Sequence, residues 1–194
     1  INFIFYAMAN GTGGFVSPDN ILAQLPLQEG ASVADLGCGH GYFTIPVAKL
    51  VGKDGVVKGV DVLNESLEAV RSQVQINGLL NIETLRGNLE ILGGSKIADS
   101  SMDLALLHNV LFQSQKKNEI LREAKRILKS GGTLTVIDWL APQTKTPGLA
   151  NLGPQEGWFI SAGDMKKLAE SEDFIFQKDL DAGEYHFGLL FAKL

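Results

Sequence analysis

Short apolar runs alternate with longer amphipathic stretches along most of this chain. Runs that are apolar throughout are typical of strands covered on both faces, whereas apolar residues that recur every three or four positions are typical of helices packed on one side. The predicted strands lie at residues 33–36, 56–61, 82–86, 102–107, 133–137, 174–176 and 185–192. The predicted helices lie at residues 17–25, 43–50, 64–77, 116–129 and 161–169.

Capping residues support several of these helix boundaries. Ser17 followed by Pro18 is typical of an N-cap with proline at the first helical position. Gly78 is a C-terminal stop for the helix at 64–77, and the glycine pair at 131–132 is expected to end the helix at 116–129. Ser161, three residues before an acid, begins the last helix in the manner of a capping box.

Strands that alternate with helices predict an α/β fold in which helices cover both faces of a mostly parallel sheet. The last two strands are separated by only a short connection, which predicts an antiparallel hairpin. With 194 residues the chain is expected to form one domain. We assign residues 17–194 to this domain and residues 1–16, which are apolar and glycine-rich, to an N-terminal arm or lid.

The first strand ends in a glycine turn, residues 37–41, and a helical pattern follows at once. Strand, glycine turn and helix in this order are typical of a nucleotide-binding βαβ unit. Tyr42 stands where a dinucleotide-binding turn has its third glycine, and the chain has no P-loop sequence. No Lys or Arg lies between Ala31 and Pro46, while Asp35 precedes the turn. These features favour a cationic ligand over a phosphate.

Asp61 ends the second predicted strand, twenty residues after Gly41. An acid at about this offset binds the ribose diol in nucleotide-binding folds. The sequence therefore indicates a ligand with a ribosyl group and a positive charge but no diphosphate, which is a description of S-adenosylmethionine.

Composition restricts the partners. The net charge of −5 and the pI of about 5.2 disfavour binding to nucleic acid or to anionic lipid. The apolar run at the start of the chain is too short to span a bilayer, so no membrane span is expected. The single cysteine, Cys38, suits a reducing compartment, and we expect a cytoplasmic protein. The oligomeric state has no sequence signal, and no metal site is expected.

Five segments together resemble the class I S-adenosylmethionine-dependent methyltransferases, in the branch that acts on small molecules and quinones. The segments are residues 33–41 (VADLGCGHG), 60–61 (VD), 86–89 (RGNL), 103–108 (DLALLH) and 128–134 (LKSGGTL). The resemblance covers nearly the whole chain and implies a single-domain Rossmann-like sheet of seven strands in the order 3-2-1-4-5-7-6, with the last strand antiparallel. It also implies S-adenosyl-L-methionine as the cofactor.

The resemblance assigns the methionine part of the cofactor to the first strand and its turn. It implies that the backbone of Gly37, Gly39 and Gly41 approaches this part of the cofactor and that Asp35 orients its amino group.

The adenosine part is assigned to the next three strand ends. Asp61 is implied to bind the ribose hydroxyls and Val62 to pack on the adenine. Asn88 stands where many relatives have an Asp that binds the adenine amine, a bond that the Asn carbonyl can also accept. Leu89 follows Asn88 in the same motif and is included in the site. His108 is implied to present its backbone carbonyl.

Transfer of a methyl group from a sulfonium is an in-line displacement, so catalysis mostly requires alignment and the exclusion of water. A base is needed only if the acceptor carries a proton at the reacting atom. The candidate catalytic residues are His108 and Asp138, each at the end of a predicted strand, and Tyr185 and His186 are weaker alternatives.

The acceptor is expected to be a small molecule. The Asn/Asp-Pro-Pro-aromatic tetrapeptide of enzymes that methylate exocyclic or amide nitrogens is absent, since residues 108–111 read HNVL. Cys38 lies in the glycine turn, so a cysteine nucleophile or thiol capture of arsenite is not expected. The segments 1–16 and 139–160 are the candidates for contacting the acceptor.

Two alternatives remain open. A nicotinamide-dependent oxidoreductase can use a similar sheet, although Tyr42 and the absence of a Tyr-x-x-x-Lys pair disfavour it. A non-catalytic module that binds S-adenosylmethionine is also compatible, because no base can be assigned with the sequence alone.

Overall fold

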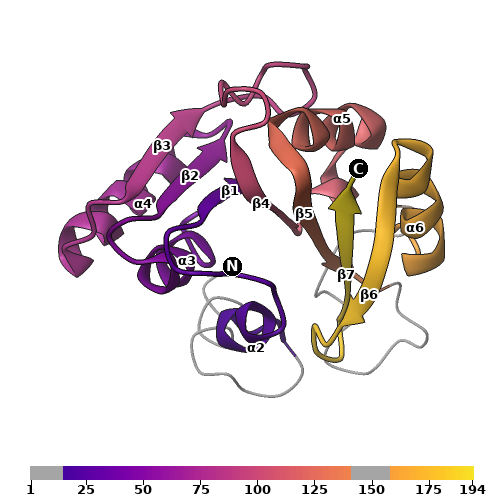
Figure 1. The fold of residues 1–194 in the computed structure, drawn as a ribbon, viewed down its shortest axis with the longest axis horizontal. Helices are drawn as coiled ribbons and strands as arrows, with labels where there is room; N and C mark the ends of the chain where they lie inside the picture. Colours follow the sequence, from indigo (N-terminus) through magenta and orange to yellow (C-terminus); the bar gives the residue numbers. More distant parts are fainter. Residues whose placement is uncertain (1–14, 141–157) are drawn as a thin grey trace.

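The computed structural model describes residues 15–140 and 158–194. Its centre is a seven-stranded sheet in the order β3-β2-β1-β4-β5-β7-β6 (Figure 1). Strands β1 to β5 pair in parallel, and β7 runs antiparallel to both β5 and β6. The predicted fold class and strand order are therefore confirmed. The strands are β1 (Ser32–Leu36), β2 (Val56–Asp61), β3 (Ile82–Arg86), β4 (Met102–His108), β5 (Leu128–Trp139), β6 (Phe174–Leu180) and β7 (His186–Lys193).

Helices cover both faces of the sheet, as the alternating pattern predicts. On one face α3 packs against β1 and β2, and α4 packs beside α3 against β2 and β3. The helix α2 contacts α3 and contributes to the same buried cluster. On the opposite face α5 and α6 pack against β4, β5 and the hairpin. The helices are α2 (Pro18–Ala23), α3 (Thr44–Val51), α4 (Asn64–Asn77), α5 (Lys117–Ile127) and α6 (Ala162–Ser171), with a 3₁₀ turn η1 (Leu111–Gln113) before α5.

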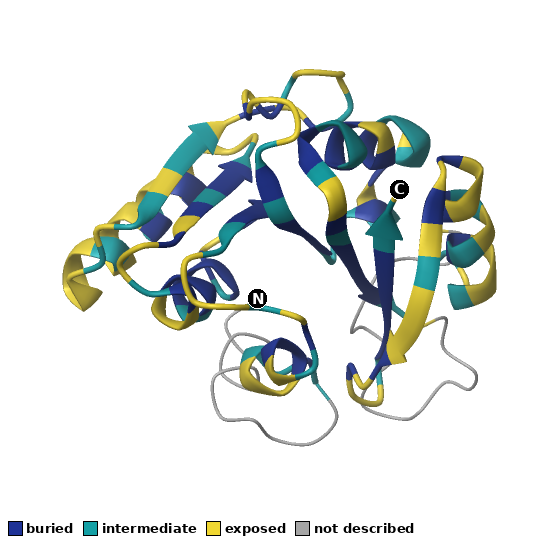
Figure 2. Cartoon of the chain, viewed as in Figure 1, coloured by how far each residue is buried: buried dark blue, intermediate teal, exposed yellow. Residues whose placement is uncertain are grey.

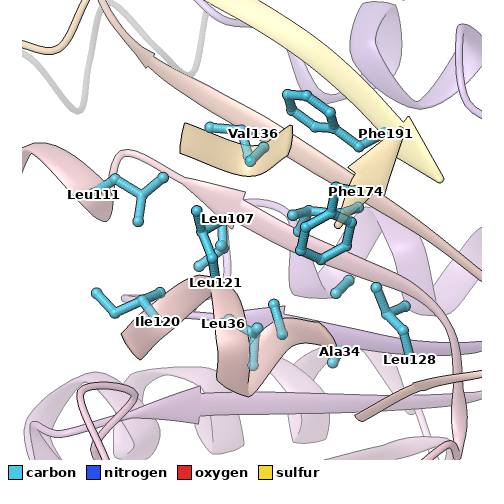
Figure 3. Packing of buried hydrophobic residues seen from close by; sticks show 14 of the residues in the cluster. Ala34, Leu36, Leu107, Leu111, Ile120, Leu121, Leu128, Val136, Phe174 and Phe191 are labelled. Atoms are coloured by element: carbon cyan, nitrogen blue, oxygen red, sulfur yellow. The ribbon is translucent and has the colours of Figure 1, made fainter. Parts of the chain in front are cut away.

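Alternate side chains of β1 point to opposite faces, and this alternation divides the core. Ala34 and Leu36 pack with α5 residues such as Leu121 in the larger cluster (Figure 3). Val33 faces α2 and α3 instead. The central strands are almost wholly buried while the helices show one exposed side (Figure 2), as expected of a parallel sheet covered on both faces. Asp35 falls on the α3 face.

Two helix ends confirm the capping signals. Gly78 adopts the left-handed conformation (φ +62°) directly after α4, and its N–H donates to the Gln75 carbonyl. The Ser161 hydroxyl accepts a hydrogen bond from the Asp164 N–H (3.0 Å) at the start of α6.

Four predicted boundaries are wrong, one of them the end of the strand predicted at 174–176, which continues to Leu180. The helix predicted at 116–129 ends at Ile127, because Leu128 already pairs with Met102 as the first residue of β5. The strand therefore begins five residues before Thr133 and contains a register shift opposite 102–104. The first helix ends at Ala23 rather than continuing to Leu25, whose position before Pro26 disfavours a helical backbone.

The predicted arm and the long loop lie largely outside the described residues. Residues 1–14 and 141–157 are not described, so the division of the chain at residue 16 and a lid role stay predictions. Among the described helices, none has the length and apolar character needed to cross a membrane.

Candidate functional site

A cavity of about 680 Å³ lies at the carboxyl ends of β1, β2, β3 and β4. The strand order reverses between β1 and β4, and ligands of open α/β sheets bind at such a point. Eight of the nine predicted cofactor-binding residues line this cavity. They are Asp35, Gly37, Gly39, Asp61, Val62, Asn88, Leu89 and His108.

Asp61 is fixed at the tip of β2 with its carboxylate turned toward the glycine turn. Its Oδ2 accepts the N–H of Gly39 (3.0 Å) and its Oδ1 accepts the N–H of Leu63 (2.9 Å). Each carboxylate oxygen can accept more than one hydrogen bond, so both oxygens can also bind hydroxyl groups in the cavity. The two backbone bonds hold the carboxylate in place for this task.

Asp35 lies beneath the turn and is almost wholly buried, with 3% of its surface exposed. Its Oδ2 accepts a hydrogen bond from the Thr44 hydroxyl (2.6 Å) at the start of α3. Burial raises the pKa of Asp35 to about 6, the bond from Thr44 partly offsets this, and the negative Asp61 adds to it. A cation placed beside Asp35 would therefore favour its ionised form.

The three glycines of the turn have different roles. Gly37 has φ +82°, which L side chains rarely adopt, and a Cβ there would lie 2.5 Å from a methyl of Val110, so a side chain at this position would be strained. A Cβ at Gly39 would meet no atom within 4 Å, which leaves its backbone (φ +50°) open toward a ligand. Gly41 does not line the cavity; its backbone (φ +87°) lies against Val70 of α4, where a Cβ would come within 3.2 Å. Gly41 packs against α4 in this structure, and its contact with the cofactor stays a prediction.

His108 forms part of the cavity wall at the end of β4. Its Nε2 lies 2.8 Å from the Thr135 hydroxyl, and its ring packs edge-on against Phe43 with centroids 4.2 Å apart. Burial lowers the pKa of His108 to about 3, and the neighbouring His186 contributes in the same direction. The ring is therefore neutral at pH 7, which makes it a hydrogen-bonding group and a weak base.

The charges of the cavity fit the predicted cofactor. Among the described lining residues, Asp35, Asp61 and Glu90 are acidic and none is Lys or Arg. An ammonium and a sulfonium are favoured in such surroundings, whereas a diphosphate has no cationic partner there. The open backbone at Gly39 and the oriented carboxylate of Asp61 complete a site for an adenosyl cation.

A family model described as "Methyltransferase domain" matches residues 27–173. The chain belongs to this methyltransferase family. The matched region contains every strand from β1 to β5 and therefore the whole described cavity except Val16.

Curated relatives of this methyltransferase domain have known activities of their own. The chain is 36% identical over 116 residues to the arsenite methyltransferase of Aquipseudomonas alcaligenes, which covers 58% of this chain and 34% of that protein. It is 30% identical over 125 residues to the demethylmenaquinone methyltransferase of Bacillus velezensis, which covers 64% of this chain and 52% of that protein. The matches thus span a third to about half of the relatives' lengths.

Solved structures confirm the class I fold. A SAM-dependent methyltransferase from Aquifex aeolicus superposes with a TM-score of 0.81, covering 93% of this chain and 91% of that chain at 24% identity. At this level of identity the likeness concerns the fold. The methyltransferase family indicates S-adenosyl-L-methionine as the cofactor.

Asp138 of this methyltransferase domain is not placed as a catalytic residue. It does not line the cavity, and its two carboxylate oxygens accept the N–H groups of Phe112 (2.9 Å) and Trp139 (2.8 Å). Burial raises its pKa to about 6, an effect that these two bonds partly offset. The catalytic role of Asp138 therefore stays a prediction, although its carboxylate is directed to the backbone N–H groups of Phe112 and Trp139.

Several lining residues had no sequence signal. Glu90 closes the site beside Asn88, whose Oδ1 accepts the Glu90 N–H (2.9 Å), and Glu90 in turn accepts the Ser114 hydroxyl (2.6 Å). Ser114 follows η1, a single irregular turn that has no periodicity to detect. The other lining residues that the sequence missed are Val16, Cys38, His40, Tyr42, Phe43, Leu63, Ser66, Gly87, Asn109, Val110, Gln113 and Ile120.

Proposed function

We propose that this methyltransferase domain transfers a methyl group from S-adenosylmethionine to a small-molecule acceptor. The observation that carries the proposal is the Asp61 carboxylate, which is held by the Gly39 N–H at the edge of an acidic cavity. The cofactor supplies an activated methyl group on a sulfonium, so the protein needs to bind, orient and exclude water.

Each predicted residue of the cavity has a task in this function. Asp61 accepts hydrogen bonds from the ribose hydroxyls, and Val62 and Leu89 offer apolar surface to the adenine. Val62 is 50% exposed without a ligand, which suits a side chain that a bound ring covers. Asn88 lines the same part of the cavity. Asp35 provides a negative charge for the amino group of the methionine part of the cofactor.

An organic acceptor is favoured over arsenite. The printed sequence contains one cysteine, Cys38, and burial raises the pKa of its thiol well above the usual range. Binding of trivalent arsenic by protein requires thiolates, which a buried single thiol does not provide. The arsenite activity of the Aquipseudomonas relative is therefore not transferred to this chain, and a carbon-based acceptor of the kind named for the Bacillus relative is the better model. A cytoplasmic location stays a prediction that the lone cysteine supports.

Calorimetry separates the cofactor alternatives. We expect S-adenosylmethionine to bind to the purified protein and NAD to give no heat. Asp61→Ala should lower the affinity for S-adenosylmethionine roughly ten- to a hundredfold, because each hydrogen bond to a charged group contributes about 1.5–3 kcal/mol. Asp54→Ala, at an exposed acid that forms an ion pair with Lys53, should bind S-adenosylmethionine as the original chain does. Tight NAD binding without binding of S-adenosylmethionine would refute the proposal.

Turnover separates the enzyme from a binding module. Release of S-adenosylhomocysteine is measured with a panel of hydroxylated, amine and thiol acceptors. Release that depends on one class of acceptor supports the enzyme, and tight cofactor binding with no release on the whole panel favours a non-catalytic module.

A further inference from the structure

Four buried polar atoms without a hydrogen-bond partner belong to residues at the C-terminal end of β4 and at the first position of β7. In the part of the chain that the structure describes, they are Nδ1 of His108, Oδ1 of Asn109 and both ring nitrogens of His186. An unpaired buried polar atom costs about 1–3 kcal/mol, so native proteins contain few of them. Their concentration in one place indicates groups that a ligand satisfies.

The sheet register places these residues together. His108 pairs with Ile137 of β5, and two residues further along β5 Trp139 pairs with His186. Side chains two residues apart on a strand share a face, and so do directly paired residues. His108, Trp139 and His186 therefore project from the same face of the sheet, the one that α2 and α3 cover. The two histidines are close enough for His186 to influence the pKa of His108.

Aromatic rings surround the unpaired atoms. Phe43 packs edge-on against His108, and Trp139 lies tilted against His186 with centroids 4.2 Å apart. Tyr185, next to His186, contacts Phe15 at 5.0 Å between centroids. Flat apolar walls around a few polar atoms are typical of sites for ring-shaped ligands.

The charge state favours an uncharged ligand group. Burial lowers the pKa of His186 to about 4, so it is neutral at pH 7 as His108 is. Among the described lining residues no Lys or Arg is present to bind an anionic acceptor. A neutral imidazole has one donor and one acceptor nitrogen, whereas Asn109 Oδ1 only accepts. A hydroxyl group donates and accepts, so it can satisfy each of these atoms.

Asn109 is the first residue after β4. Asn109 has φ +57°, an uncommon conformation for a residue other than glycine, and it lines the cavity directly after β4.

We propose that His108, Asn109 and His186 form the acceptor subsite and bind an uncharged aromatic compound through its hydroxyl group. This subsite rests on the proposed methyl transfer, because it adjoins the cavity assigned to the cofactor. The occupant is a phenol-type molecule, bound with its ring against the aromatic side chains and its hydroxyl at the imidazole and amide groups.

The test uses 2-naphthol as the probe and 2-naphthoate as its anionic counterpart. Both are titrated by calorimetry into the full chain saturated with S-adenosylhomocysteine, and the imidazole nitrogens are followed by ¹⁵N NMR. The sequence contains three histidines, so His40 is an internal reference. We expect 2-naphthol to shift the signals of His108 and His186 but not those of His40, and 2-naphthoate to bind at least tenfold more weakly.

Two variants remove the polar atoms separately. His186→Phe keeps a ring beside Trp139, and Asn109→Gly accepts the positive φ. Each variant should weaken the binding of 2-naphthol by roughly three- to tenfold, as expected for one neutral hydrogen bond. His186→Phe, at a residue that does not line the cofactor cavity, should leave the affinity for S-adenosylhomocysteine unchanged. Gln177→Ala, at an exposed position of β6, should change neither affinity.

The outcomes are distinguishable. The subsite is refuted if 2-naphthoate binds as tightly as 2-naphthol, if neither histidine signal moves, or if both variants bind 2-naphthol unchanged. Failure of the original chain to bind S-adenosylhomocysteine refutes the proposed function instead, and the same titrations of the unliganded protein then decide on the subsite.

Discussion

At the scale of single residues, the site contains a carboxyl group whose ionised form is disfavoured by burial. Asp35 is buried beneath the turn with a pKa of about 6, above its ordinary value of 3.8. The folded protein then binds a proton more tightly than the unfolded chain between these two values. The protonated Asp35 carboxyl therefore favours the folded state at low pH, and this contribution to the free energy of unfolding is lost as the pH rises from about 4 to 6. Above pH 6 the buried negative charge of Asp35 opposes folding.

Asp35→Asn should therefore stabilise the unliganded protein at pH 8. The amide can still accept the Thr44 hydroxyl, and removal of the buried charge is expected to raise the free energy of unfolding by about 1–3 kcal/mol. At pH 3, where both states are protonated, the gain should vanish. Urea unfolding at the two pH values measures this, with the exposed Asp54→Asn as control. A variant less stable than the original chain at pH 8 would contradict the role assigned to burial.

The same carboxyl should make cofactor binding depend on pH. A bound ammonium favours the ionised form of Asp35, so S-adenosylmethionine should bind more weakly below pH 6, by up to about tenfold per pH unit. Asp35→Asn should bind weakly at every pH and lose this dependence. Calorimetry from pH 5 to 8 checks both, and an original chain whose affinity stays constant across the range would show that Asp35 does not contact the cation.

At the scale of elements, a buried acid of α5 positions one side of the cavity. Glu123 accepts the N–H groups of Gly93 (2.7 Å) and Ser95 (2.9 Å) and forms an ion pair with Arg126 (2.7 Å). Burial alone would raise its pKa, but the bonds from Arg126, Ser95 and Gly93 outweigh burial and lower the pKa to about 2. The loop held in this way begins with Asn88, so α5 sets the position of the adenine side of the site.

Glu123→Gln should weaken cofactor binding without contacting the cofactor. The side-chain amide of this variant loses the ion pair with Arg126. It also has one acceptor oxygen in place of the two that accept the Gly93 and Ser95 N–H groups. We therefore expect the free energy of unfolding to fall by about 2–4 kcal/mol. The KM for S-adenosylmethionine should rise more than kcat falls, since we propose that the loop 88–95 contributes to binding and not to the reaction. Glu170→Gln on α6, which is exposed, is the matched control. A change in kcat alone, with an unaltered KM, would contradict a positioning role.

Local patterns predict the elements well where burial and capping agree. The helix α4 and the strands β2 and β3 have their predicted bounds, because their periodicity ends at a glycine or at an acid. The junction of α5 and β5 was misplaced because Leu128 suits the apolar pattern of the helix and of the strand equally, and its pairing with Met102 decides between them. The contacts of Glu123 had no local signal, since they join residues about thirty positions apart.

At the scale of the whole molecule, parallel strands that end at one edge bring distant residues into one cavity. Asp35, Asp61, Asn88 and His108 were predicted from their strand ends, and all four line the cavity. The strand order itself was implied by the resemblance and not by periodicity. A strand end does not fix the direction of a side chain, which is why Asp138 was predicted as catalytic but binds the backbone at Phe112 and Trp139.

The most direct test of the central claim is a crystal structure of the protein with S-adenosylhomocysteine. We expect both ribose hydroxyls within hydrogen-bond distance of the Asp61 carboxylate and the amino acid portion over Gly39. A ligand bound elsewhere, or an Asp61 carboxylate that faces away from the ribose, would contradict the assignment of this cavity as the cofactor site.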